Sequence, residues 1–139
     1  MAPHPTAEDL LEAARSARDR AYAPYSGYPV GAAILAEDGL VYAGCNVENA
    51  AYPVGTCAEA GALAAMVAGG GRRIREMLVV AGGAELVAPC GACRQRIREF
   101  AADDVAVHLA GPDGIGRSVT VVDMLPLAFG PTMLPASAR

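Results

Sequence analysis

The sequence has no long apolar run, although hydrophobic residues make up 53% of its 139 residues. No stretch reaches the roughly 18 consecutive apolar residues that a membrane-spanning helix needs. The first residues lead directly into a charged segment, without the apolar core of a secretory signal peptide. We therefore expect a cytoplasmic protein with no membrane partner.

The sequence also lacks an excess of positive charge, because its formal net charge is −4 at pH 7. Proteins that bind nucleic acids usually carry a basic face. Arg72, Arg73 and Arg75 form the only tight basic cluster, and Arg94, Arg96 and Arg98 alternate on one predicted helix. We interpret both sets as solvated surface. We expect no nucleic-acid partner.

Internal repeats, low-complexity tracts and linker segments are absent as well. A chain of 139 residues is long enough to bury a sizeable core and fits one domain. We therefore expect residues 1–139 to form a single domain. Charged residues make up only 19%, which favours a compact globule with much of its surface buried, some of it between subunits.

Apolar periodicity, turn residues and helix caps predict the order helix, strand, strand, helix, strand, helix, strand, strand, helix. The first helix begins at Thr6, capped together with Asp9, and runs to about Tyr22. Asp38-Gly39 joins the first two strands as a hairpin. The other predicted ranges are strands 30–36, 40–46, 76–81, 105–110 and about 117–119, and helices 57–68, about 91–100 and a short one capped by Thr120 and Asp123. This order predicts an α/β fold, a three-layer α/β/α arrangement with a five-stranded mixed sheet.

Three of the four cysteines lie where predicted helices begin. Cys90 and Cys93 are separated by two residues at one helix start, and Cys57 precedes another. Thiols in this spacing ligate Zn²⁺, and a third thiol completes three protein ligands. Three ligands leave one coordination position open for water, which is typical of a catalytic zinc. Glu59, two residues after Cys57, is then placed to handle the protons of that water.

Other interpretations of the cysteines stay open at this point. The four thiols could form two disulfides, although a reducing compartment and the ligand-like spacing favour thiolates. Cys90 and Cys93 could serve as a redox dithiol, and a zinc site could also staple a binding module without catalysis. Cys45 is interpreted as a buried thiol, and His4 and His108 are not expected to be ligands.

The motif Cys57-Ala58-Glu59, followed by Pro89-Cys90-Gly91-Ala92-Cys93, resembles that of the zinc deaminases, in which an all-cysteine ligand set also occurs. The chain resembles the small cytidine deaminases from about residue 20 to residue 131. Further matching motifs are Pro24-Tyr25-Ser26, Val30-Gly31-Ala32-Ala33, Gly44-Cys45-Asn46-Val47-Glu48-Asn49-Ala50, Arg94-Gln95, Leu125-Pro126 and Phe129-Gly130-Pro131. The resemblance implies a cytidine deaminase-like fold with Zn²⁺ as cofactor. It also implies hydrolytic deamination of cytidine and deoxycytidine to uridine and deoxyuridine, with release of ammonia, in pyrimidine salvage.

The resemblance implies roles for residues beside the metal ligands. Glu59 moves protons to the cytosine ring and to the leaving amino group. Asn46 and Glu48 hold the ribose hydroxyls, and the backbone N–H of Ala58 holds O2 of the base. A turn-capping Asn46 and a solvated Glu48 are the plain structural alternatives.

Three aromatic residues are implicated in the same way. Tyr28 occupies the position of a phenylalanine that lines the nucleoside pocket in the family. Phe129 and Tyr52 match residues that contribute to pockets shared between subunits, which implies a homotetramer acting on a small nucleoside. Ordinary packing is the alternative for Tyr28 and Phe129.

The chain departs from the family after Glu59, where Ala60-Gly61 replaces a common Arg-Thr pair. Three thiolates on one Zn²⁺ leave a net negative formal charge, so a positive group is needed near the sulfurs. We hypothesise that Arg94, directly after Cys93, supplies it. A modified aminopyrimidine nucleoside, such as a nucleoside antibiotic, is the alternative substrate. The acidic charge balance argues against a nucleic-acid-editing deaminase.

Overall fold

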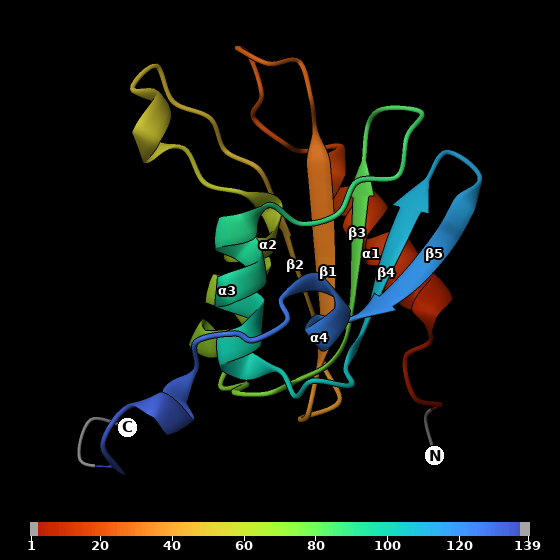
Figure 1. Cartoon of the computed structure of the whole chain (residues 1–139). Coiled ribbons are helices and arrows are strands. Elements are labelled where there is room, and N and C mark those ends of the chain that lie inside the picture. Colours follow the sequence, from red (N-terminus) through yellow and green to blue (C-terminus); the bar gives the residue numbers. More distant parts are fainter. Residues whose placement is uncertain (1–2, 137–139) are drawn as a thin grey trace.

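The computed structural model describes residues 3–136. Within this range the strands form a five-stranded mixed sheet in the order β2-β1-β3-β4-β5 (Figure 1). β3 and β4 run parallel, whereas the other neighbouring strands pair antiparallel. The strands are β1 (Val30–Ala36), β2 (Val41–Cys45), β3 (Ile74–Ala81), β4 (Ala106–Gly111) and β5 (Gly114–Thr120). The predicted mixed sheet is confirmed.

Helices cover both faces of this sheet, with α1 on one face and α2 and α3 on the other (Figure 1). Met77 and Val79 of β3 join the core beneath α2 and α3. The alternate side chains Leu78 and Val80 join the core beneath α1, which confirms the three-layer α/β/α arrangement. The helices are α1 (Ala7–Arg18), α2 (Ala58–Ala68), α3 (Gly91–Phe100) and α4 (Val121–Met124), with short 3-10 helices η1 (Tyr52–Val54) and η2 (Pro131–Met133).

Two element boundaries differ from the prediction by three or more residues, whereas the others agree to within two. α1 ends at Arg18 rather than near Tyr22. Tyr22 instead pairs with Val47 in an isolated bridge, so the chain leaves the helix early. β5 begins at Gly114 rather than about Arg117, because a turn with a φ of 106° at Gly114 brings the chain straight back onto β4. Both differences arise from pairing between segments, which local patterns do not report.

Two glycines let helices approach the sheet closely. A Cβ atom on Gly44 of β2 would lie 2.3 Å from the backbone nitrogen of Ala62 in α2. A Cβ atom on Gly31 of β1 would lie 1.9 Å from the carbonyl oxygen of Ala14 in α1. Only a residue without a Cβ permits such contacts. Gly44 therefore sets the distance between the sheet and α2, the helix that begins next to Cys57.

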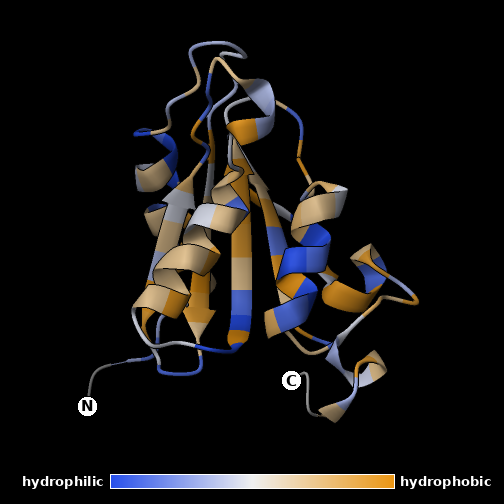
Figure 2. Ribbon diagram, turned by 90° about the vertical axis from the view of Figure 1, so that its left-hand side faces the viewer, coloured by the Kyte–Doolittle hydropathy of each residue, from blue (hydrophilic) through white to orange (hydrophobic). Residues whose placement is uncertain are grey.

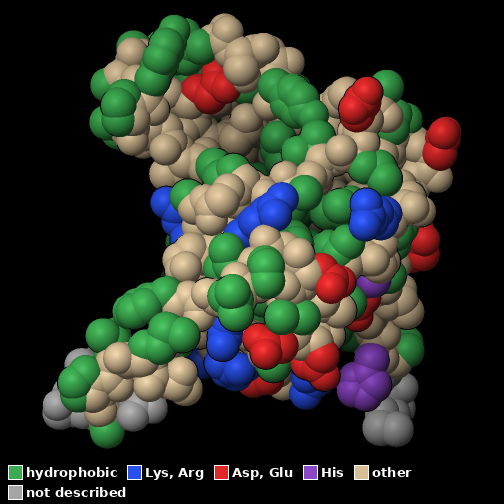
Figure 3. Space-filling model, viewed as in Figure 1, with side chains coloured by type: hydrophobic (Ala, Val, Ile, Leu, Met, Phe, Trp, Pro, Cys, Tyr) green, Lys and Arg blue, Asp and Glu red, His purple; other side chains and the backbone are tan. Residues whose placement is uncertain are grey.

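Two segments project from the side of the molecule that carries α2 and α3 (Figure 1). We call residues 46–57, which include η1, the η1 loop, and residues 125–136, which include η2, the C-terminal arm. Hydrophobic side chains gather on both projections (Figure 3). Tyr52 on the η1 loop is 75% exposed, and Phe129 on the C-terminal arm is 56% exposed. Among residues 3–136, no helix has the length and apolarity to cross a membrane.

Candidate functional site

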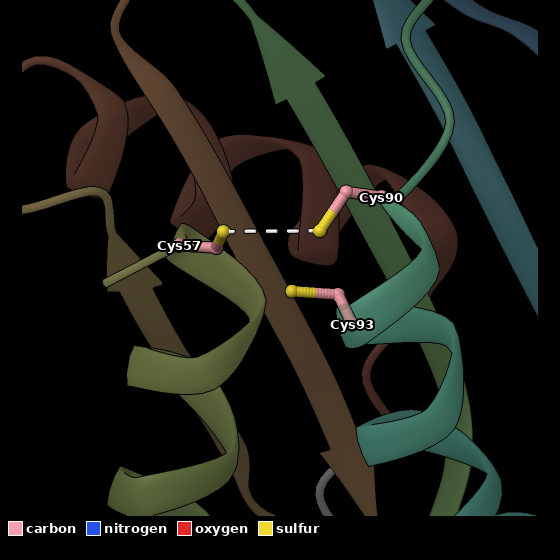
Figure 4. Close-up of side chains that lie close together, drawn as sticks. All are labelled: Cys57, Cys90 and Cys93. Atoms are coloured by element: carbon pink, nitrogen blue, oxygen red, sulfur yellow. Dashed lines mark hydrogen bonds between the residues drawn. The ribbon is translucent and has the colours of Figure 1, made fainter. Parts of the chain in front are cut away.

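The fold brings Cys57, Cys90 and Cys93 together from two helices. Cys57 caps the start of α2, Cys90 caps the start of α3, and Cys93 lies in the first turn of α3. The three side chains point toward one another (Figure 4). All three Sγ atoms lie within 4.8 Å of one another, and those of Cys57 and Cys90 are 4.0 Å apart. The sequence prediction that these thiols share one place is confirmed.

The spacing of the sulfurs fits a zinc ion. Two thiolates bonded to one tetrahedral Zn²⁺ at about 2.3 Å lie about 3.8 Å from each other, close to the 4.0 Å between Cys57 and Cys90. All four cysteines, including Cys45 on β2, are free thiols. The sulfurs are therefore arranged as ligands of one metal and not as disulfides.

Burial makes this cluster unfavourable for thiolates without a cation. Burial raises the pKa of the Cys57 thiol, and burial together with the negative charge of Glu59 raises that of Cys93. The pKa of Cys90 is lowered instead, chiefly by the backbone N–H of Cys93 at the start of α3. A divalent cation is the group that would hold all three sulfurs as thiolates.

Glu59 lies one residue inside the start of α2, beside the cysteines. Glu59 is only 5% exposed, and among the described residues it is the only charged residue that is buried. Burial raises the pKa of the Glu59 carboxyl, while its own backbone N–H and the charge of Arg96 oppose this shift. A carboxyl group with a raised pKa and no fixed ion-pair partner is suited to exchanging protons near neutral pH.

A cavity of about 320 Å³ opens beside the cysteines and Glu59. The start of α2, the end of β2 and the loop before α3 form its walls. This volume falls in the range of sites for small organic ligands. The lining includes Val30, Asn46, Glu48, Thr56, Cys57, Ala58, Glu59, Val79, Ala88 and Cys90. The cavity thus joins a prospective metal, a proton-exchanging carboxyl group and polar side chains.

Asn46 and Glu48 use part of their hydrogen-bonding capacity to shape this cavity. The Asn46 amide donates to the carbonyl of Tyr28 and accepts from the N–H of Val30, both at 2.9 Å. The Glu48 carboxylate accepts from the N–H groups of Tyr25 and Ser26 and from the Ser26 hydroxyl. One amide hydrogen of Asn46 and one lone pair of the Glu48 carboxylate remain available for a ligand.

Comparison with known proteins identifies the family. The model of the zinc-binding region of cytidine and deoxycytidylate deaminases matches residues 5–109. The chain belongs to this family. A cytidine deaminase from Sporosarcina psychrophila is 45% identical over 132 residues, which cover 95% of this chain and 97% of that protein. The predicted family and its zinc cofactor are therefore confirmed, and the redox interpretation of Cys90 and Cys93 is not supported.

Solved structures of the family share the fold. The crystal structure of cytidine deaminase from Burkholderia pseudomallei has a TM-score of 0.84 and 44% identity, and covers 89% of this chain and 99% of its own. The structure of cytidine deaminase from Mycobacterium tuberculosis has a TM-score of 0.78 and 38% identity, and covers 88% and 96%. The predicted cytidine deaminase-like fold is confirmed.

The three aromatic residues predicted to bind the substrate lie outside the walls of the main cavity of this deaminase. Tyr28 is partly buried with its ring beside Gly83. Tyr52 lines a neighbouring cavity of about 340 Å³, which shares Glu48 with the main one. Phe129 is exposed on the C-terminal arm. These residues were assigned to the site by resemblance to the family. Within a single subunit, none of the three lines the cavity beside the cysteines.

Arg94 does not contact the cysteine sulfurs, contrary to the hypothesis from the sequence. Its guanidinium donates to the carbonyls of Pro89 and Met124, at 2.8 and 2.9 Å. One residue along a helix turns the side chain by about 100°, so Arg94 points away from Cys93. Arg94 instead holds the loop before Cys90 against α4.

Arg96 is the residue that the sequence interpretation missed. The sequence pattern predicts solvated surface for it, but its Nη1 lies 3.6 Å from Cys93 Sγ and donates a hydrogen bond to it. Residues three apart on a helix share a face. The three-residue spacing of Cys93 and Arg96 on a predicted helix could therefore have indicated this contact from the sequence.

Proposed function

We propose that this member of the deaminase family catalyses zinc-dependent hydrolytic deamination of cytidine and deoxycytidine, giving uridine or deoxyuridine and ammonia. The observation that supports it most directly is the buried Glu59 carboxyl beside three clustered thiols in a cavity of nucleoside size. The relatives named as cytidine deaminases, at 40 to 45% identity, support the same reaction.

Substrate binding uses groups that already face the cavity. The amide hydrogen of Asn46 that Tyr28 leaves free donates to a ribose hydroxyl. The Glu48 carboxylate accepts from a ribose hydroxyl with the lone pair that Tyr25 and Ser26 leave free. The backbone N–H of Ala58, at the start of α2, is one of the N–H groups that a helix leaves without an internal partner. It holds O2 of the base and points the C4 amino group toward the thiols.

Cys57, Cys90 and Cys93 hold the metal ion. When bound, Zn²⁺ supplies a Lewis acid that lowers the pKa of water to about 7. Glu59 accepts a proton from the attacking water and delivers it to ring N3, which makes C4 electrophilic. Glu59 then moves a second proton from the new hydroxyl group on C4 to the amino group, so that the C4–N bond breaks, ammonia leaves and the uracil carbonyl remains. A buried carboxyl group suits both steps because it alternates between base and acid within one turnover.

We further propose that the deaminase works as a homotetramer in the cytoplasm, within pyrimidine salvage, with residues 1–139 as one domain. The exposed Tyr52 and Phe129 support shared pockets, because each projects from the body of the subunit. Phe129 stacks on the base bound by a neighbouring subunit, Tyr52 contributes to the shared pockets, and Tyr28 lines the nucleoside pocket. The net charge of −4 supports a free nucleoside rather than a nucleic acid as substrate.

A modified aminopyrimidine nucleoside is the alternative substrate. The same metal and proton chemistry would act on it, and an altered sugar or base would need an altered cavity. The free capacity of Asn46 and Glu48 suits an ordinary ribose, and the named relatives are cytidine deaminases. This alternative is not favoured.

The test is the rate of cytidine absorbance loss with the parent protein and with Glu59→Gln. Glu59→Gln keeps the shape of the side chain but cannot shuttle protons, so we expect turnover to fall by about 100-fold or more. Zinc content is measured in both proteins and is expected to be equal. Glu12→Gln, at an exposed position of α1, is the matched control and retains full activity.

Two outcomes would contradict the proposal. A zinc-loaded parent that leaves cytidine intact would remove the substrate assignment, and modified aminopyrimidine nucleosides would be tested next. Full activity of zinc-loaded Glu59→Gln would remove Glu59 from the proton steps.

A further inference from the structure

The cysteine cluster needs a positive group that the ligands themselves do not supply. Three thiolates and one Zn²⁺ carry a net negative formal charge, and Cys93 has no exposed surface. A buried negative charge is costly unless a nearby cation or hydrogen-bond donor compensates it. The sulfur of Cys93 therefore requires a donor from elsewhere.

Arg96 provides that donor. Its Nη1 lies 3.6 Å from Cys93 Sγ, within the range of hydrogen bonds to sulfur. The contact follows from the helix, because Cys93 and Arg96 are three residues apart on α3 and share the face toward α2. Arg94 and Arg98 on the same helix donate to backbone carbonyls instead. Among residues 3–136, Arg96 is the only arginine that donates a hydrogen bond to the sulfur of Cys57, Cys90 or Cys93.

The room for Arg96 comes from small residues on the facing helix. A groove between α2 and α3 is lined by Ala60 and Ala64 on one side and by Arg96 on the other. Figure 2 looks onto these helices and shows α2 mostly in pale and orange colours, whereas much of α3 is in the blue of hydrophilic residues. A long side chain at Ala60 would fill the same space, so the small residue on α2 and the arginine on α3 fit each other.

We infer that Arg96 is a positioning residue of the metal centre, whose guanidinium compensates the negative charge of the thiolate cluster through Cys93 Sγ. The inference rests on the proposed zinc-dependent function. Arg96 strengthens zinc binding and draws electron density from the Cys93 sulfur. It replaces a cation from the start of α2, where this chain has Ala60.

Zinc affinity of the parent and of Arg96→Ala, measured by competition with a chromogenic chelator, tests the inference. Loss of a group that hydrogen-bonds a metal ligand weakens metal binding by about 10- to 100-fold. We expect this loss in Arg96→Ala and a smaller one in Arg96→Lys, which keeps the charge. Arg98→Ala is the matched control on the same helix and is expected to bind zinc as the parent does. Unchanged zinc affinity in Arg96→Ala would overturn the inference.

A double variant separates charge from packing. Ala60→Arg combined with Arg96→Ala moves the guanidinium to the other wall of the groove, and we expect it to recover zinc affinity. A folded double variant that binds zinc as weakly as Arg96→Ala would show that packing caused the loss, and the inference would fail.

The spectrum of the Co²⁺-substituted protein reads the sulfur directly. Removing a hydrogen bond raises the energy of the sulfur lone pairs, so the thiolate-to-Co²⁺ charge-transfer band of Arg96→Ala is expected at longer wavelength than that of the parent. An unshifted band would contradict the inference. These readouts do not depend on cytidine turnover, so a parent that binds zinc without deaminating cytidine fails the proposed function alone.

Discussion

Single carboxylates in this deaminase hold loops by accepting hydrogen bonds from successive backbone N–H groups. Glu48 does so at the cavity, and the hydrogen bond from the Ser26 hydroxyl lowers the pKa of its carboxyl. Glu37 does the same at the far end of the β1–β2 hairpin, where it accepts from the N–H groups of Arg72 and Arg73, both at 2.8 Å. Each carboxylate thus joins segments that local sequence does not connect.

Glu37 leads to a prediction about pH and stability. The N–H of Arg72 is the largest cause that lowers the pKa of Glu37 below its ordinary value of 4.5. A lowered carboxyl pKa stabilises the folded state above the unfolded-state pKa, and this stabilisation is lost as the pH falls through the folded-state pKa. We expect Glu37→Gln to be less stable than the parent above pH 4.5 and the difference to vanish well below it.

Urea denaturation of both proteins at several pH values checks this. Glu12→Gln, an exposed change on α1, is the control and is expected to match the parent throughout. A stability difference for Glu37→Gln that stays constant with pH would show that the carboxylate charge is not involved.

At the scale of elements, the metal centre depends on how closely α2 and α3 lie against the sheet. Cys57 stands at the start of α2, and Cys90 and Cys93 at the start of α3, so a shift of either helix changes the distances between the sulfurs. Gly44 sets the position of α2, because any Cβ there would overlap the backbone of Ala62.

Gly44→Ala and Gly31→Ala form a matched pair that tests this dependence. Each adds one methyl group beneath a helix, so we expect both to destabilise the fold by about 1–3 kcal/mol. Only Gly44→Ala displaces α2, so only this variant is expected to lose zinc affinity, whereas Gly31→Ala disturbs α1 on the opposite face. Chelator competition and urea denaturation measure the two effects. Equal zinc affinity in the two variants would show that the centre tolerates movement of α2.

At the scale of the whole molecule, the exposed apolar side chains are concentrated on the two projections. Tyr52, Val54, Leu127, Phe129, Met133 and Leu134 all belong to the η1 loop or the C-terminal arm and remain exposed in the single chain (Figure 3). Apolar side chains exposed together on projecting segments are typical of contacts between subunits. It supports the proposed homotetramer.

Phe129→Ala tests the shared pocket. Stacking of an aromatic side chain on a base contributes about 1–3 kcal/mol, so we expect the KM for cytidine to rise by roughly 5- to 150-fold. Steady-state kinetics measures this, and sedimentation velocity reports the assembly of each protein. Leu40→Ala, exposed in the β1–β2 turn, is the control. A parent that is monomeric and fully active would contradict the shared pocket.

Much of the fold was predictable because its signals are local. The Asp38-Gly39 turn, the cap formed by Thr120 and the apolar run of β3 each depend on neighbours in the sequence, and all three are present in the structure. The helix over 91–100 was predicted with the boundaries that it has. The end of α1 was not, because the pairing of Tyr22 with Val47 joins distant segments.

The sequence by itself determined which groups are available for chemistry, because the spacing of Cys90 and Cys93, the third thiol of Cys57 and the adjacent Glu59 favour a metal centre with the proton carrier that we propose. Only the tertiary structure decided which arginine serves the sulfurs. Arg94 and Arg96 are both near Cys93 in sequence, but the rotation of α3 against α2 and α4 turns the first to Met124 and the second to Cys93. Which side chain meets which atom depends on the packing of helices, and that is a property of the folded chain.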